Sequence, residues 1–216
     1  MKRISIIGDS NSTSYLQDEG VLSSMNNLYS FHLAKFGFEV IPMSFVSNNT
    51  KKIVDRSNFF LRNANSEYFI LQIGWIDSSP ISYPKWVKIL VELKIKGFKK
   101  ILQKIISHYK NYYKKNYIPL ISIKQFQENL EKIIEIINNN NNSKIIFLTI
   151  PFSSDKVMNI QRQKFNRIII NLSRQSNCDV IDTYELTKNK DMLNSTGHFS
   201  EKAHYEISQM ILEKIT

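Results

Sequence analysis

The chain has 216 residues, a hydrophobic fraction of 42% and a formal net charge of +10. This length fits one domain, over residues 1–216, that buries its core without disulfides or metals, and the one cysteine, Cys178, excludes an intrachain disulfide. No apolar run reaches the roughly 20 residues that span a bilayer, and no secretory signal is recognised, so we expect a cytoplasmic protein.

The first predicted element is a short apolar run, Ile4–Ile7, followed by Gly8, Asp9 and Ser10. Its β-branched residues predict a buried strand, and Gly8 permits a sharp exit from it. Ser10 then lies where the strand ends, which in an open α/β sheet is the crevice where ligands bind. Asp9 and Ser10 are also common helix caps, so these residues alone leave a catalytic and a capping interpretation open.

Short apolar runs and segments with apolar residues at helical spacing alternate along the rest of the chain. This β-α-β order predicts a parallel sheet with helices on both of its faces. Pro42 weakens the end of the second strand, Gly37 is expected to end the first helix, and Asn138–Asn142 is expected to be a polar loop. The predicted strands are 4–7, 38–43, 68–73, 144–150 and 179–182, and the predicted helices are 22–36, 51–65, 123–137, 160–172 and one after His198.

Residues 81–118 are the most basic part of the chain, with ten lysines and one acid, Glu92. Aromatic and aliphatic residues recur there at helical spacing, so we expect a lysine-rich helical insertion. Its lysines are either a solvated helix face or a surface for anions, namely a phosphorylated sugar donor or an anionic membrane surface. The latter would place the protein at the inner face of the membrane. Nucleic acid is not expected, because no nucleic-acid motif accompanies the charge.

A histidine, His198, stands directly before the predicted last helix. A serine hydroxyl is a weak nucleophile until a base takes its proton, and imidazole suits that task near neutral pH. His198 is therefore the candidate base for Ser10. His204 is expected to be a packing or surface residue. The spacing of histidines and Cys178 indicates no metal site, and no glycine-rich phosphate loop is present, so no cofactor is expected.

The Gly-Asp-Ser after the first strand and the histidine before the last helix resemble the SGNH (GDSL-type) hydrolases, in block order over nearly the whole chain. The resemblance implies a three-layer α/β/α sandwich with a flavodoxin-like parallel sheet, in which Ser10 is the nucleophile and His198 the base. It also implies an oxyanion hole of backbone N–H groups, from Ser10 and from the loop after the second strand. There the glycine of the family is absent, and Asn48 or Asn49 is the candidate donor.

The third block of the family, Gly-x-Asn-Asp, is matched by Gly74 and Asp77, but Ile76 stands where the family has its oxyanion-binding Asn. Gly74 remains a candidate for the oxyanion hole. The block looks like a Gly-Ile-Val-Asp variant met in bacterial surface-polysaccharide synthesis. Asp77, like Asp9, is expected to support the structure of its own loop rather than to carry a proton.

The acid that the family places three residues before the histidine is also missing, because that residue is Ser195. The imidazole is then oriented by Ser195, by Asp191, by Asp182 or Glu185, or by a backbone carbonyl beside a Ser10–His198 dyad. The resemblance implies a serine esterase or acyltransferase for O-acyl, chiefly acetyl, groups of a sugar or cell-surface polysaccharide. The alternative is a weak or non-hydrolytic module of polysaccharide assembly that uses residues 81–118 to hold a phosphorylated donor or a membrane.

Overall fold

A five-stranded parallel sheet forms the centre of the computed structural model, in which residues 1–12, 25–57, 61–62, 64–81, 84, 87, 103–109, 112, 117–140 and 143–216 are described. The strand order is β2-β1-β3-β4-β5, and every neighbouring pair is parallel. This is the flavodoxin-like order that the resemblance implied. The strands are β1 (Arg3–Gly8), β2 (Glu39–Pro42), β3 (Tyr68–Gln72), β4 (Lys144–Leu148) and β5 (Asp179–Ile181).

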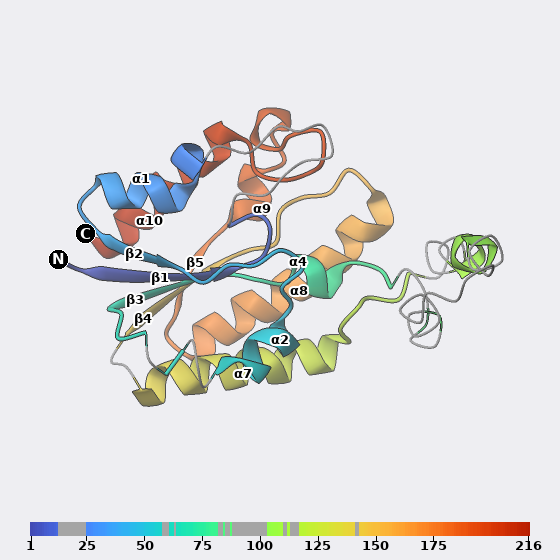
Figure 1. Ribbon diagram of the computed structural model, residues 1–216, viewed down its shortest axis with the longest axis horizontal. Coiled ribbons are helices and arrows are strands. Elements are labelled where there is room, and N and C mark those ends of the chain that lie inside the picture. The colour runs from blue at the N-terminus through green and yellow to red at the C-terminus, as the bar shows by residue number, and fades with distance from the viewer. Residues whose placement is uncertain are drawn as a thin grey trace, which may run out of the picture.

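Helices cover both faces of the sheet, which confirms the predicted three-layer fold (Figure 1). One layer holds α1 (Tyr29–Lys35) and α10 (Glu201–Ile215), and the other holds α2 (Thr50–Asp55), α7 (Ile123–Asn140) and α8 (Lys156–Gln175). Short helices occur in the connections: η1 (Met25–Asn27), α4 (Trp75–Ser78), α9 (Thr183–Leu186) and η2 (Lys190–Met192).

The core is divided between the two faces by the alternation of side chains along each strand. In β1, Ile4 and Ile6 pack toward α1 and α10, whereas Ile7 packs toward α7 and α8. In β3, Ile70 and Leu71 divide in the same way, and both are fully buried. Strands buried on both faces are apolar without interruption, which is why these runs could be recognised in the sequence.

Several predicted boundaries were wrong, for local reasons. Asn138–Asn140 continue α7 instead of beginning a loop, and α8 begins four residues early because the Asp155 carboxylate accepts hydrogen bonds from the first N–H groups of that helix. Of the helix predicted over 51–65, α2 ends at Asp55, Ser57 is again helical, and residues 58–60 and 63 lie outside the described ranges. There the Ser57 hydroxyl donates to the carbonyl of Val54, at 2.7 Å.

Two predictions fall largely on residues outside the described ranges. In the lysine-rich segment 81–118, only residues 81, 84, 87, 103–109, 112, 117 and 118 are described, and 103–109 are helical. The start of the helix predicted over 22–36 also lies outside them, and the described part contains η1 followed by α1. As predicted, Gly37 follows α1 with a left-handed backbone, at φ +88°.

The carboxyl ends of β1 and β3 form the crevice of this fold. The chain leaves β1 toward β2 on one side, and all later strands are added on the side of β3, so the connections diverge between these two strands. Ser10 follows β1, and Gly74 begins α4 directly after β3 with φ +106°. A Cβ atom on Gly74 would lie 2.7 Å from Ile150 Cδ1 and 3.2 Å from the Phe126 ring.

We therefore expect Gly74→Ala to destabilise the protein more than Gly37→Ala. Both glycines need a left-handed backbone, which costs an alanine about 1–2 kcal/mol. A Cβ on Gly37 has nothing within 4 Å, whereas one on Gly74 enters the core and adds an overpacking cost of about 1–3 kcal/mol. Urea denaturation measures both changes in the free energy of unfolding. Equal losses would show that packing around Gly74 does not limit this position.

Candidate active site

Ser10 and His198 lie in contact at the carboxyl edge of the sheet, although 188 residues separate them. The Ser10 hydroxyl oxygen, Oγ, is 3.0 Å from His198 Nε2, which is hydrogen-bonding distance. Ser10 is 8% exposed and His198 is half-buried, in the loop between η2 and α10. The structure thus brings together the two residues that the sequence nominated as nucleophile and base.

A buried polar network holds the turn that carries Ser10 in place. The Asp9 carbonyl accepts from the Ser12 N–H at 3.1 Å, and its carboxylate accepts from the Asn11 N–H at 3.0 Å. The Tyr29 hydroxyl donates to Ser12 Oγ, which in turn donates to the Gln72 side chain of β3. The turn folds back so closely that a Cβ on Gly8 would lie 2.8 Å from Ser12 Cβ. Gly8 is thus needed for this close approach, and its φ is not positive.

A direct hydrogen bond joins the loop of the serine to the loop of the histidine. The Phe199 N–H donates to Asn11 Oδ1 at 3.1 Å, and both residues are buried, with exposed fractions of 4% and 1%. These are the sequence neighbours of His198 and Ser10. The distance between the reactive side chains is therefore set in part by this buried hydrogen bond between a backbone N–H and the Asn11 side chain, and not only by Ser10 and His198 themselves.

Asn194 shapes the loop that carries the imidazole. Its side-chain oxygen, Oδ1, accepts from the N–H groups of Thr196 and His198, at 3.0 and 3.1 Å. Its backbone N–H donates to the His198 carbonyl at 2.8 Å, and its own carbonyl accepts from Gly197. Two N–H donors on one side-chain atom identify that atom as the oxygen of the amide.

This loop also determines which nitrogen of His198 carries the proton. Thr196 Oγ1 is 2.7 Å from Asn194 Oδ1, which can only accept, so the hydroxyl proton points to Asn194. Thr196 Oγ1 is also 2.9 Å from His198 Nδ1, and toward that nitrogen it can only accept. Nδ1 therefore carries the proton, and the lone pair of Nε2 faces the Ser10 hydroxyl. This tautomer is the one that a general base for Ser10 requires.

The residues that the sequence nominated to orient the imidazole lie elsewhere. Ser195 and Asp191 are exposed, and neither hydrogen-bonds to His198. Asp182 accepts from Thr149 and caps α9, and Glu185 forms an ion pair with Lys188 at 2.6 Å. Thr196 was not predicted as the orienting residue, because the sequence pattern directs attention to an acidic side chain in this role. The available signal was the run Asn194-Ser-Thr-Gly-His198, in which a side chain that can form a turn stands four residues before the histidine.

Burial and a nearby cation keep His198 neutral. The pKa of its imidazole is lowered to about 4, first by burial and then by the positive charge of Arg162. The Trp75 ring stacks on the imidazole with the ring centroids 5.2 Å apart, and the Arg162 guanidinium lies 4.2 Å from the centre of the same indole. Trp75 and Arg162 were not nominated from the sequence, where Arg162 is one of many polar residues in a long helix.

The candidate oxyanion donors differ in whether their N–H groups already donate a hydrogen bond within the protein. The Asn48 N–H donates to the Phe45 carbonyl at 3.1 Å, and its side chain donates to the Gly8 carbonyl at 3.2 Å. The Asn49 side chain caps α2 by accepting from the Lys52 N–H. Within the described ranges, the backbone N–H groups of Ser10, Asn49 and Gly74 have no protein acceptor. Of the nominated groups, these three remain able to bind a substrate oxygen.

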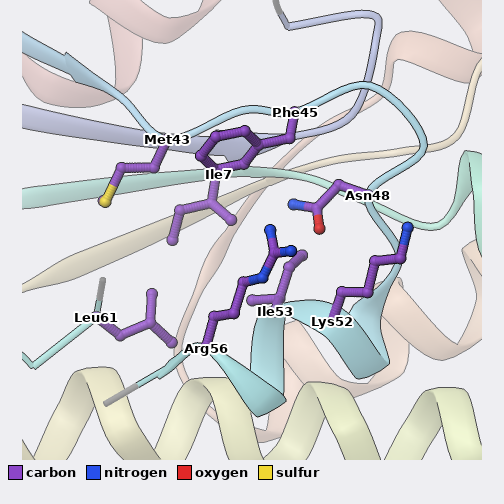
Figure 2. A pocket seen from close by; sticks show the side chains of 8 residues that line it. All are labelled: Ile7, Met43, Phe45, Asn48, Lys52, Ile53, Arg56 and Leu61. Carbon is purple, nitrogen blue, oxygen red and sulfur yellow. The ribbon is translucent and has the colours of Figure 1, made fainter. Parts of the chain in front are cut away.

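The loop of Asn48 and Asn49 is held from two sides. Figure 2 shows Asn48 and Arg56 pointing into the small pocket between this loop and α2, while Lys52 extends along the edge of the pocket to the loop. The Lys52 ammonium donates to the Ser47 carbonyl at 2.9 Å. From the other side, the Asp77 carboxylate accepts from the N–H and hydroxyl of Thr50, at 3.0 and 2.5 Å. Asp77 was expected to support its own loop, but its carboxylate holds Thr50, directly after the neighbouring loop.

Other titratable groups support the site from within the core. Burial raises the pKa of Asp9 to about 7 and that of Asp77 to about 6. His204 is a packing residue, as predicted: it is buried against Tyr29 and its Nδ1 accepts from the Tyr29 N–H at 3.4 Å.

Among the described residues, no three His, Cys, Asp or Glu side chains gather as a metal would require. None of the described helices combines the length and apolar character needed to cross a bilayer.

No protein-family model matches the sequence, and no relative was found among curated proteins. Solved structures do match along the whole chain. A lipase/acylhydrolase from Enterococcus faecalis has a TM-score of 0.69 at 20% identity, covering 100% of this chain and 95% of its own. TesA has a TM-score of 0.67 at 13% identity, covering 100% of this chain and 98% of its own. An acetyl-xylooligosaccharide esterase from Geobacillus stearothermophilus has a TM-score of 0.66 at 14% identity, covering 99% and 94%. At these identities, the likeness establishes the shared fold.

The tautomer and pKa of His198 can be tested without any substrate. We expect a histidine NMR titration to give His198 a pKa of about 4, with nitrogen shifts that place the proton on Nδ1 at neutral pH. The pKa of His32, a more exposed histidine, is also lowered, by its partial burial and by Lys35, and serves as the internal comparison. A His198 pKa near its ordinary value, or a proton on Nε2, would contradict the assignment.

Proposed function

We propose that this protein is a serine esterase of the SGNH type that acts on O-acyl esters, with Ser10 as nucleophile and His198 as general base. The observation that carries the proposal is the 3.0 Å contact between Ser10 Oγ and the unprotonated Nε2 of His198. A neutral imidazole at neutral pH is ready to accept the serine proton.

In the proposed reaction, Ser10 Oγ attacks the ester carbonyl carbon while its proton passes to His198 Nε2. The carbonyl oxygen becomes an oxyanion, for which the N–H groups of Ser10, Asn49 and Gly74 are the candidate donors. The imidazolium then gives its proton to the leaving alcohol, and the C–O bond breaks to leave an acyl-serine. A water, activated by His198 in the same way, attacks the acyl group and releases the acid and free Ser10.

The orienting group in this proposal is a hydroxyl and not a carboxylate. Thr196 Oγ1 accepts a hydrogen bond from His198 Nδ1–H and its hydroxyl donates one to Asn194 Oδ1, so the tautomer is held without a negative charge. A neutral partner stabilises the imidazolium less than an aspartate does, and Ile76 supplies no side-chain donor to the oxyanion. We therefore expect slower turnover than a full triad would allow.

We further propose that the acyl group is acetyl and that the alcohol is a sugar, such as a unit of a surface polysaccharide. The acetyl-xylooligosaccharide esterase among the similar structures supports this choice of ester. If a sugar hydroxyl takes the place of water in the second step, the same acyl-serine gives acyl transfer. The uncharged orienting group favours, as the second candidate, a protein that holds such esters with little or no hydrolysis.

The Ser10→Ala variant tests the first candidate against the second. Removing the nucleophile is expected to lower kcat/KM for 4-nitrophenyl acetate by at least about 1000-fold, because serine and histidine act as one unit. The exposed serine variant Ser107→Ala is the matched control and should keep wild-type rates. Equal rates for wild type and Ser10→Ala, or no acetyl release above background by wild type, would remove Ser10 from the proposal.

The role of Thr196 as a positioning residue predicts a specific pattern of rescue. Thr196→Val keeps the shape but removes the hydroxyl and its hydrogen bonds with Asn194 and His198 Nδ1, so kcat/KM should fall about tenfold, equivalent to about 1.4 kcal/mol. Thr196→Ser restores the hydroxyl and should recover most of the rate. The pH profile of each variant shows whether the His198 base is affected. A Val variant as fast as wild type would contradict the role.

A further inference from the structure

Arg162 is a buried cation whose hydrogen bonds leave one edge of its guanidinium without an acceptor. It projects from α8 and is 3% exposed. Its Nη1 donates to the carbonyls of Pro151 and Phe152, at 2.9 and 3.0 Å. Nε is enclosed without an acceptor, and in the described part of the chain Nη2 forms no hydrogen bond either. Nε and Nη2 form the edge with which arginine binds carboxylates and phosphates by two parallel hydrogen bonds.

No carboxylate forms an ion pair with Arg162 in the described ranges. Asp9 and Asp155 act on it only at longer range. Its burial lowers the pKa of the guanidinium to about 10, the direction expected where the charged form has lost water. A buried charge without a counter-charge is unfavourable, and groups perturbed in this way cluster at functional sites.

Arg162 lines a groove of about 530 Å³ that is basic. Lys188 and Lys190 line the same groove from the α9–η2 segment, and no acidic side chain is among its described lining residues. The Lys188 ammonium forms an ion pair with the Glu185 carboxylate at 2.6 Å, whereas Lys190 is exposed at the start of η2. An anion in this groove would lie near the buried guanidinium of Arg162 and near the exposed side chains of Lys188 and Lys190.

The groove begins beside the proposed catalytic pair. Trp75 and Thr196 line it, and these residues contact the imidazole of His198, by ring stacking and through Nδ1. When an ester is cleaved by a serine–histidine pair, the imidazole returns its proton to the leaving alcohol, which must therefore lie beside the histidine. The acyl half then points away from it. The groove is thus placed to hold the alcohol half of an ester.

We propose that this groove binds an anionic substituent, a phosphate or a carboxylate, on the alcohol half of the substrate, with Arg162 as its main contact and Lys188 and Lys190 as assistants. The substrate class is then an acyl ester of a phosphorylated or acidic sugar. This proposal rests on the proposed esterase function for its catalytic consequence, whereas anion binding in the groove does not depend on catalysis.

The binding experiment uses the Ser10→Ala protein, so that no turnover occurs. Inorganic phosphate and glucuronate are titrated separately, with the indole N–H signal of Trp75 as the NMR readout and with glucose as the neutral control. We expect a saturable shift with one or both anions and none with glucose. Which anion binds more tightly distinguishes a phosphate substituent from a carboxylate.

Three variants in the same background locate the binding. Arg162→Gln should weaken anion binding about tenfold or more, as loss of charge-assisted hydrogen bonds does. Combined Lys188→Gln and Lys190→Gln replaces two exposed side chains and should weaken it even if Arg162→Gln fails to fold. Arg167→Gln removes an exposed charge from the same helix and is the matched control. Absence of a saturable shift, or the same affinity in all variants, would overturn the proposal.

A kinetic comparison then separates the two proposals. With wild-type protein, kcat/KM for acetylated glucose 6-phosphate and acetylated glucuronate is expected to exceed that for acetylated glucose, and the ratio should fall in the lysine double variant. Hydrolysis of all three esters at equal rates would refute the proposed role of the groove in substrate binding and would leave the esterase proposal intact. Anion binding without hydrolysis of any ester would refute the esterase and leave the groove as an anion site.

Discussion

The hydrogen bond between Asn11 and the backbone of Phe199 is the contact on which the site depends. It joins the turn after the first strand to the loop before the last helix, in the buried layer directly beneath Ser10 and His198. Each side of this contact has its own support: the Tyr29–Ser12–Gln72 network on one side and the Asn194 turn on the other. Because both loops are hydrogen-bonded where they meet, the 3.0 Å approach of serine and imidazole needs little further ordering of their side chains.

The charges around His198 differ from those of a serine hydrolase with an acidic third residue. The partner of Nδ1 is a neutral hydroxyl that adds no negative charge, and burial together with the Arg162 cation across Trp75 disfavours the imidazolium. An anion bound at Arg162 would reduce this repulsion at the moment when His198 takes the serine proton. Under the two proposals, the negative charge that an acidic third residue supplies within the protein would here arrive with the substrate. Selectivity and rate would then depend on the same electrostatic interaction.

The sequence was sufficient for the fold because apolar strands and helices of ordinary spacing specify a parallel sheet, and the Gly-Asp-Ser of β1 and the histidine before α10 are local motifs. The residues it missed act through contacts between distant segments. Thr196 is oriented by a turn, Trp75 stacks from a different strand end, and Arg162 looks like any polar residue of an amphipathic helix until its burial is seen. Asn138–Asn140 were misassigned because their low helix propensity predicts an end to the helix, whereas α7 continues through them.

The distance along the chain between the two halves of the site has a consequence for how the protein matures. Ser10 is synthesised 188 residues before His198, and β1 lies between strands that come later in the sequence. Closing so long a loop is entropically costly until the intervening sheet has formed, so the pair can meet only late in folding. A nascent chain on the ribosome would carry the serine without its base. Any reactivity of Ser10 would thus arise only after synthesis of α10 and its docking on the sheet.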